Sequence, residues 1–92
     1  MSATTDIKIL YFAWVRARAG LAEESVALPA GVSDVRALLD WLKTRSPGHA
    51  EALRDPSAIR VAVNQEYVAA NAPVKAGDEI AIFPPVTGGC EQ

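Results

Sequence analysis

Residue types that form covalent cross-links or hold metal ions are scarce in this chain of 92 residues. It has one cysteine, Cys90, and one histidine, His49. A single cysteine cannot form an internal disulfide, and a structural zinc site needs several Cys, His or carboxylate ligands gathered together. We therefore expect neither an internal disulfide nor a structural metal.

An excess of positive charge is also missing. Nine basic residues stand against eleven acidic ones, which gives a formal net charge of −2 at pH 7. Binding to nucleic acid or to anionic lipid depends on a clustered positive surface. The composition therefore predicts no nucleic-acid partner and no membrane partner.

Long hydrophobic runs are absent as well. The longest uninterrupted apolar stretch covers residues 9–15, far short of the roughly 20 residues that a membrane-spanning helix needs. The first residues, MSATTDIKI, lack the basic start and apolar run of a secretory signal. We expect a cytoplasmic protein.

The residues that are present indicate one folded domain. Half of them are apolar and 22% are charged, as in globular domains, and 92 residues allow one modest core. β-Branched and aromatic runs predict strands at 7–13, 25–29, 60–64, 67–69 and 79–83, with a short helical turn closed near Gly20. The first of these runs is apolar on both faces after Lys8, which is typical of a central strand or of one whose second face meets a partner.

The main helix is predicted between residues 32 and 48. Four apolar side chains fall there at helical spacing on one face: Val35, Leu38, Leu39 and Leu42. Ser33 is placed to cap the first amides, Asp34 suits the positive end of the helix dipole, and residues 46–48 break the pattern. A second short helical piece is expected over 49–55, ended by Pro56.

The order strand, strand, helix, strand, short strand, strand predicts an α+β fold. A mixed sheet of four to five strands would pack on one main helix through a right-handed crossover, as in the ubiquitin-like β-grasp roll. We expect residues 1–86 to form this domain. Residues 87–92 would be a flexible C-terminal tail that contains Gly88-Gly89 and a Cys-Glu-Gln extension.

Groups that could catalyse a reaction are few. A Cys90–His49 pair is not expected, because a residue third from a terminus is not held beside a partner. The pairs Glu23-Glu24 and Asp78-Glu79 are interpreted as solvated charge, since adjacent strand residues point to opposite faces. His49, after Pro-Gly, is expected at the surface or at a helix start. The chain is therefore not expected to be an enzyme by itself.

The most unusual feature is the stretch after the last strand. Pro84 and Pro85 fix two φ angles and remove two amide donors, so the chain leaves the sheet in a stiff direction. Thr87-Gly88-Gly89 adds little side-chain volume, and residues 84–89 reach about 20 Å when extended. A frayed terminus is the alternative, but it requires neither the proline pair nor the glycine pair.

Three stretches resemble a known family: IKILYFAWVRARAG, VAVNQEYV and above all GDEIAIFPPVTGG. Over residues 7–89 the chain is similar to the small, sulfur-carrying subunit of molybdopterin synthase. The last stretch is the most specific of the three. A Gly-Gly end alone is shared with ubiquitin-like modifiers and with the sulfur carrier of the thiamin pathway.

The resemblance implies a carrier mechanism without a bound cofactor. An E1-like adenylyltransferase would use ATP to activate the carboxylate of Gly89, which a sulfurtransferase as sulfur donor would then convert to a thiocarboxylate, with Gly88 as a slender neck. The charged arm would enter the large subunit and give its sulfur to cyclic pyranopterin monophosphate, which forms molybdopterin. The family also suggests a heterotetramer of two small and two large subunits.

The resemblance further implies the partner-binding residues. Five residues would anchor and steer the arm: Phe83, Pro84, Pro85, Val86 and Thr87. The doubly apolar first strand adds Leu10 and Phe12 to this surface. For these two, a second minor core under the loop 69–76 is an equally open alternative.

Cys90-Glu91-Gln92 departs from the family, whose members end at the second glycine. A protease could remove the three residues and expose Gly89, the extension could abolish transfer, or Cys90 could assist its own removal. Three functions therefore stay open after the sequence alone. These are the molybdopterin carrier, a ubiquitin-like modifier or sulfur carrier for thiamin, tRNA thiolation or cysteine synthesis, and a non-carrier interaction module.

Overall fold

The computed structural model describes residues 6–85. Its elements are β1 (Asp6–Tyr11), α1 (Ala13–Ala19), β2 (Glu23–Ala27), α2 (Val35–Leu42), α3 (Pro47–Ala52), the 3-10 turn η1 (Pro56–Ala58), β3 (Arg60–Val63), β4 (Glu66–Val68) and β5 (Glu79–Phe83). The expected boundary at residue 86 and the tail 87–92 lie outside the described residues. Every helix in the described range falls short of what a membrane span requires.

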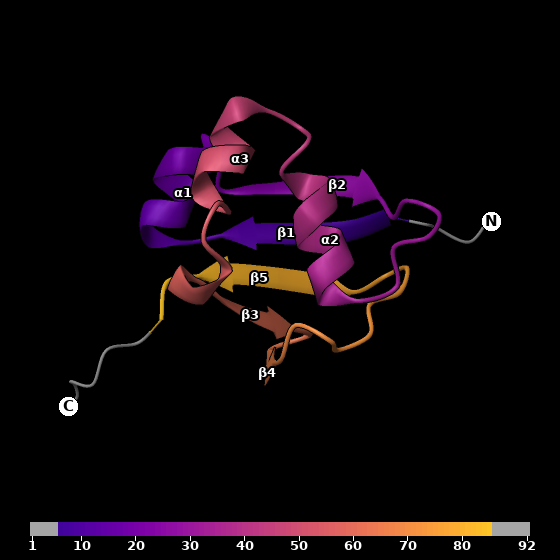
Figure 1. Cartoon of the computed structure of the whole chain (residues 1–92). Helices are drawn as coiled ribbons and strands as arrows, with labels where there is room; N and C mark the ends of the chain where they lie inside the picture. Colours follow the sequence, from indigo (N-terminus) through magenta and orange to yellow (C-terminus); the bar gives the residue numbers. More distant parts are fainter. Residues whose placement is uncertain (1–5, 86–92) are drawn as a thin grey trace.

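The sheet is mixed and has five strands in the order β2-β1-β5-β3-β4. The first and last strands, β1 and β5, run parallel at its centre, with Ile9 opposite Ile80, and the other pairs are antiparallel. Figure 1 shows α2 crossing the sheet, with α1 and α3 together nearer one end of it. The predicted α+β, β-grasp fold is confirmed. The short helical turn expected before Gly20 and the short helical piece expected after residue 48 are α1 and α3, and the sequence did not predict that the two pack against each other.

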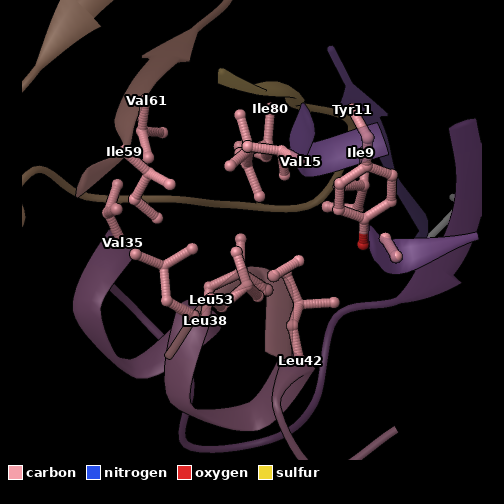
Figure 2. Close-up of a cluster of buried hydrophobic side chains, with 14 of the residues drawn as sticks. Ile9, Tyr11, Val15, Val35, Leu38, Leu42, Leu53, Ile59, Val61 and Ile80 are labelled. Atoms are coloured by element: carbon pink, nitrogen blue, oxygen red, sulfur yellow. The ribbon is translucent and has the colours of Figure 1, made fainter. Parts of the chain in front are cut away.

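The core lies between the sheet and the helices (Figure 2). β1 alternates as a half-buried strand should, so that Ile7, Ile9 and Tyr11 point into the core. The helical face that the sequence predicts is buried on α2, and its members are Val35, Leu38, Leu39 and Leu42. Complete burial of a leucine side chain such as Leu38 contributes about 2 kcal/mol, so this face anchors α2 to the sheet.

The start of α2 corrects one prediction. Asp34, not Ser33, is the N-cap, and its carboxylate accepts a hydrogen bond of 2.8 Å from the amide of Ala37. Asp34 has the extended backbone of a cap residue, whereas the carbonyl of Ser33 accepts from the amide of Val74 at 3.0 Å. Ser33 therefore ties the preceding loop to the segment before β5.

The start of α3 also differs from the prediction. The helix begins at Pro47, two residues earlier than expected, because Ser46 is its N-cap and accepts from the amide of His49 at 3.1 Å. A proline in the first helical position has no amide to leave unsatisfied. Ser46-Pro47 thus begins a helix as well as ending the previous segment.

The turn between β3 and β4 lies one residue earlier than expected. Asn64 and Gln65 form it with φ angles of 52° and 72°, and Glu66 already belongs to β4. Two successive positive φ angles are typical of the tight hairpin turn that matches the strand twist. The side chain of Asn64 accepts from the amide of Glu79 at 3.0 Å, so the hairpin is tied to the start of β5.

Candidate functional site

The sheet has a second face, turned away from the helices, which we call the open face. Leu10 lies on this face because its neighbours Ile9 and Tyr11 point into the core. Across the strands, Leu10 is paired with Ala81, Ala81 with Ala62, and Ala62 with Tyr67. One row of apolar residues therefore crosses four strands of the open face.

Burial supports the separation of this row from the core. Ala62 is only 5% exposed, yet it does not belong to the cluster of buried side chains between the sheet and the helices. Its cross-strand neighbours on the open face, Tyr67 and Ala81, flank it instead. The open face thus has a small apolar surface of its own.

Aromatic side chains extend this surface towards the end of β5. The rings of Tyr67 and Phe83 lie 5.3 Å apart at an angle of 49°. Phe12 follows β1 in extended conformation, its amide donates to the carbonyl of Ile82 at 3.1 Å, and 47% of the residue is exposed. We call Leu10, Phe12, Tyr67, Ala81 and Phe83 the aromatic patch.

The predicted partner-binding residues can now be placed. Leu10, Phe12 and Phe83 share the open face, and Pro84 and Pro85 follow Phe83 directly as half-buried residues. Val86, Thr87, Gly88 and Gly89 lie outside the described residues, as does the extension 90–92. Their predicted roles stay predictions.

The alternative of a minor core under the loop 69–76 is wrong. The carbonyls of Ala70 and Ala72 accept from the amides of Arg36 and Val35, at 2.8 and 3.0 Å, so the loop lies against the start of α2. α2 covers the opposite face of the sheet from Leu10. The loop therefore does not cover Leu10.

Tyr67 is a member of the patch that the sequence analysis missed. It lies on the three-residue edge strand β4 and is 72% exposed. An exposed aromatic residue in a short edge strand was the available signal. Its position beside Phe83 could not be read locally, because it follows from the β4–β3–β5 pairing.

The corner between β1 and α1 is strained. Ala13, the first residue of α1, has a φ of 54°, in the left-handed region that residues with a side chain rarely adopt. The carbonyl of Phe12 accepts from the amides of Val15 and Arg16 at 3.1 and 3.3 Å, so Phe12 caps the helix with its backbone. Strand and helix are joined by this single residue.

Behind the corner lies a polar group, buried at Tyr11 and His49 and exposed at Arg45, which we call the Glu24 cluster: Tyr11, Glu24, Arg45, Ser46 and His49. Glu24 Oε2 lies 2.7 Å from both the Tyr11 hydroxyl and His49 Nε2, and Oε1 lies 3.2 Å from Arg45. His49 Nδ1 lies 2.7 Å from the Ser46 hydroxyl. Glu24 is therefore not solvated charge, which corrects that interpretation. Of the two places expected for His49, the surface is wrong and the helix start is confirmed, because His49 is buried in the first turn of α3.

Charge states in the cluster follow from its hydrogen bonds. Burial alone would raise the pKa of Glu24, but the hydrogen bonds from His49 and Tyr11 and the charge of Arg45 outweigh it, so the pKa lies below its usual value. Burial raises the pKa of Tyr11 far above its usual value, and Glu24 adds to this effect. Glu24 therefore remains an acceptor and Tyr11 a donor at neutral pH.

A second buried carboxylate has a structural role. Asp78, which we expected to be solvated, is 5% exposed and accepts from Asn64 Nδ2 at 3.0 Å and from the amide of Lys75 at 2.9 Å. It closes the turn that precedes β5. Within the described residues no three His, Cys, Asp or Glu side chains gather as ligands of a metal ion.

Comparison with known proteins places this chain in a family. The model of the ThiS family matches residues 9–89. The molybdopterin synthase sulfur carrier subunit of Escherichia coli (strain K12) is 43% identical over 83 residues, covering 90% of this chain and 99% of that protein. The protein of the same name from Arabidopsis thaliana is 34% identical over 88 residues, 96% of this chain and 88% of that protein.

A solved structure is similar to this chain in both fold and sequence. SAMP1 from Haloferax volcanii has a TM-score of 0.70 at 31% identity, over 91% of this chain and 99% of that chain. Because the family model spans most of the chain and the E. coli relative is matched over nearly its whole length, the assignment covers the described domain. The chain therefore belongs to the ThiS family, alongside proteins named as sulfur carrier subunits of molybdopterin synthase.

Proposed function

We propose that this chain is the sulfur carrier subunit of a molybdopterin synthase and acts in molybdenum cofactor biosynthesis. The observation that carries the proposal is that the aromatic patch continues directly into Pro84-Pro85, in a chain 43% identical to an E. coli protein of that name. A docking surface at the base of the arm is what a carrier needs when its end must enter a partner. The chain itself is a non-catalytic subunit.

The proposed chemistry takes place at Gly89. Removal of residues 90–92 would leave the Gly89 carboxylate at the terminus, where an E1-like adenylyltransferase uses ATP to form an acyl-adenylate. Sulfur that the sulfurtransferase supplies at the oxidation level of sulfide would then attack the acyl carbon, so that a C–S bond forms, the C–O bond to AMP breaks, and a thiocarboxylate remains. A carboxylate is a poor electrophile until its oxygen becomes part of such a leaving group, which is why ATP is required.

The partner completes the reaction. The thiocarboxylate would enter the large subunit and give its sulfur to cyclic pyranopterin monophosphate, so that molybdopterin forms. Gly88 adds no side chain near the reacting group, and the arm from Pro84 to Gly89 reaches about 20 Å when extended. This length separates the reacting end from the docking surface on the domain.

The hydrogen bonds that His49 and Glu24 already make within the chain support a carrier role. Both ring nitrogens of His49 face partners within 2.7 Å, and Glu24 accepts from three side chains. A general acid or base must reach the substrate with a free proton-transfer atom. We therefore assign acid–base chemistry to the activating enzyme and the large subunit.

The aromatic patch is proposed as the docking surface for the large subunit. Phe12 and Tyr67 are the two large apolar residues that stay exposed within the described part of the chain. Exposed aromatic side chains that gather on one face are typical of protein interfaces. Phe83, Pro84 and Pro85 would connect this contact to the arm, together with Val86 and Thr87, in a heterotetramer of two small and two large subunits.

The test compares two forms of the chain, one ending at Gly89 and one full-length. Each is incubated with the activating enzyme, ATP and the sulfur donor, and its intact mass is measured. We expect the form ending at Gly89 to exchange one oxygen for sulfur and to support molybdopterin formation with the large subunit. If this form is not charged, the carrier proposal fails.

A second candidate is a ubiquitin-like modifier, which the likeness to SAMP1, a small archaeal modifier protein, favours. Conjugation would place Gly89 in isopeptide bonds to lysines of other proteins. Mass spectrometry of proteins purified with a tagged chain separates the two functions. Isopeptide adducts support the modifier, and a stable complex with the large subunit supports the carrier.

A further inference from the structure

Phe12 is more exposed than Leu10, the member of the aromatic patch on β1. It directly precedes Ala13, whose backbone is strained. A left-handed backbone at a residue with a side chain persists only where the surrounding structure holds it. The sheet holds one arm of this corner through β1, and α1 forms the other arm. Besides the backbone bonds of Phe12 and the burial of Val15, contacts further away help to set the direction of α1 relative to β1.

On the helix side, α1 is fixed by a close backbone contact with α3. A Cβ atom placed on Gly48 would lie 2.6 Å from the carbonyl oxygen of Arg18 and 3.2 Å from that of Ala19. Only a glycine allows the start of α3 to approach the end of α1 so closely. Any movement of α3 is thus transmitted to α1.

On the strand side, α3 is tied to the sheet by the neighbour of Gly48. His49 Nε2 lies 2.7 Å from Glu24 Oε2 on β2, and the hydroxyl of Tyr11, at the end of β1, donates to the same oxygen at 2.7 Å. Tyr11 is next to Phe12 in the chain. The contacts therefore close a circuit from Phe12 through α1, α3 and β2 back to β1.

We name Tyr11, Glu24, Gly48 and His49 the clamp. The side chains of Glu24 and His49 are 11% and 8% exposed, and their remaining polar atoms meet Arg45 and Ser46. Buried polar groups with all partners present favour one geometry, because any shift leaves a group unsatisfied. The clamp thus holds α1 and β1 at one angle.

We propose that the clamp positions Phe12 for docking onto the large subunit, with Glu24 and His49 as positioning residues that do not touch the partner. This inference rests on the proposed function. A side chain already held in its bound position loses less freedom when the complex forms. Loosening the clamp should therefore weaken binding through Phe12, even though the patch keeps its composition.

The test is a double-mutant cycle in binding. The probe is the large subunit of molybdopterin synthase encoded in the same genome, titrated with this chain both full-length and ending at Gly89. We expect His49→Ala to weaken binding about tenfold when Phe12 is present and to have no further effect in the Phe12→Ala background. Tyr11→Phe, which keeps the ring and removes only the hydroxyl, should act in the same direction.

Val74→Ala is the matched control. Val74 is 5% exposed and its amide bonds to Ser33 near the start of α2, away from the clamp, so the variant loses core packing but leaves the corner intact. All variants are compared at a temperature where circular dichroism shows them folded. Val74→Ala should bind as the unaltered chain does.

NMR gives a readout that does not depend on the partner. The amide resonances of Phe12 and Ala13 should shift in His49→Ala and in Tyr11→Phe but not in Val74→Ala. Equal losses of affinity with and without Phe12, or unchanged amide resonances in both clamp variants, would overturn the inference. If neither form of the unaltered chain binds, the proposed docking fails, and the resonances still decide whether the clamp sets the corner.

Discussion

The hydroxyl of Tyr11 and the carboxylate of Glu24 are joined by a hydrogen bond of 2.7 Å between neighbouring strands, on the core side of the sheet. Tyr11 is 1% exposed and cannot readily ionise, because burial raises its pKa far above the usual value. The pair is therefore a fixed donor and a fixed acceptor. It links the stability of the fold to the charge on Glu24.

Glu24 should make stability depend on pH in the acid range. Its pKa is lowered in the folded chain, so its contribution is present above the unfolded-state pKa and is lost as pH falls through the lower, folded-state pKa. Glu24→Gln should cost about 1–3 kcal/mol at pH 7 and flatten this acid dependence. Urea unfolding from pH 7 to pH 3 measures both effects, and Glu23→Gln, an exposed neighbour, is the control. Parallel pH profiles for the unaltered chain and Glu24→Gln would contradict the prediction.

Ala13→Gly should stabilise the chain. Glycine adopts a φ of 54° without the steric cost that Ala13 bears, and the gain should be up to about 1 kcal/mol. Ala17→Gly, an exposed position within α1, should instead lose about 1 kcal/mol, because glycine is a poor helix former. Chemical denaturation of the two variants gives opposite signs if the strain at Ala13 is real. A loss in both would show that it is not.

Asp34→Ala should destabilise the chain by about 1 kcal/mol, since the first turn of α2 loses its side-chain cap. Ser33→Ala is the matched control. The bond that Ser33 makes to Val74 uses its backbone carbonyl, which the substitution keeps. Thermal unfolding followed by circular dichroism should rank the control close to the unaltered chain. An equal loss of stability in Asp34→Ala and Ser33→Ala would contradict the assignment of the cap to Asp34 alone.

Tyr67→Lys should separate docking from folding. The residue is 72% exposed, so the substitution should leave stability within about 0.5 kcal/mol. Removal of the ring from beside Phe83 should weaken binding to the large subunit, because aromatic residues contribute strongly to interfaces. Calorimetric titration measures the affinity of Tyr67→Lys for the large subunit. Glu66→Lys, which introduces a lysine on the same strand, is the control. Unchanged affinity for Tyr67→Lys would remove Tyr67 from the docking surface.

Local patterns predicted most of the fold for identifiable physical reasons. The spacing of Leu38 and Leu42 and the alternation along β1 are set by the repeat of each element, so they can be read within a few residues. The β-grasp arrangement followed because a sheet with one amphipathic helix has few ways to bury its apolar face. The element boundaries were predicted less accurately. Near the starts of α2 and α3 more than one residue can serve as N-cap, and the local sequence does not show that Asp34 and Ser46 do so.

The polar contacts were out of reach of such reasoning. Glu24 and His49 are 25 residues apart and belong to different elements, so neither carries a local signal of the other. The sequence indicated that Leu10 and Phe12 are apolar residues beyond those needed for one core face. Which face of the sheet they occupy followed only from the register of β1 against β5. Tyr67 joined them through pairings that span most of the chain.

The position of β5 between β1 and β3 determines how the domain bears a mechanical load. A strand at an edge can be peeled away one hydrogen bond at a time, whereas β5 is bonded along both sides, parallel to β1 and antiparallel to β3. A pull directed along β5 from its C-terminal end would have to shear both ladders at once. The proposed carrier arm would thus leave the domain from a strand that two neighbouring strands hold in place.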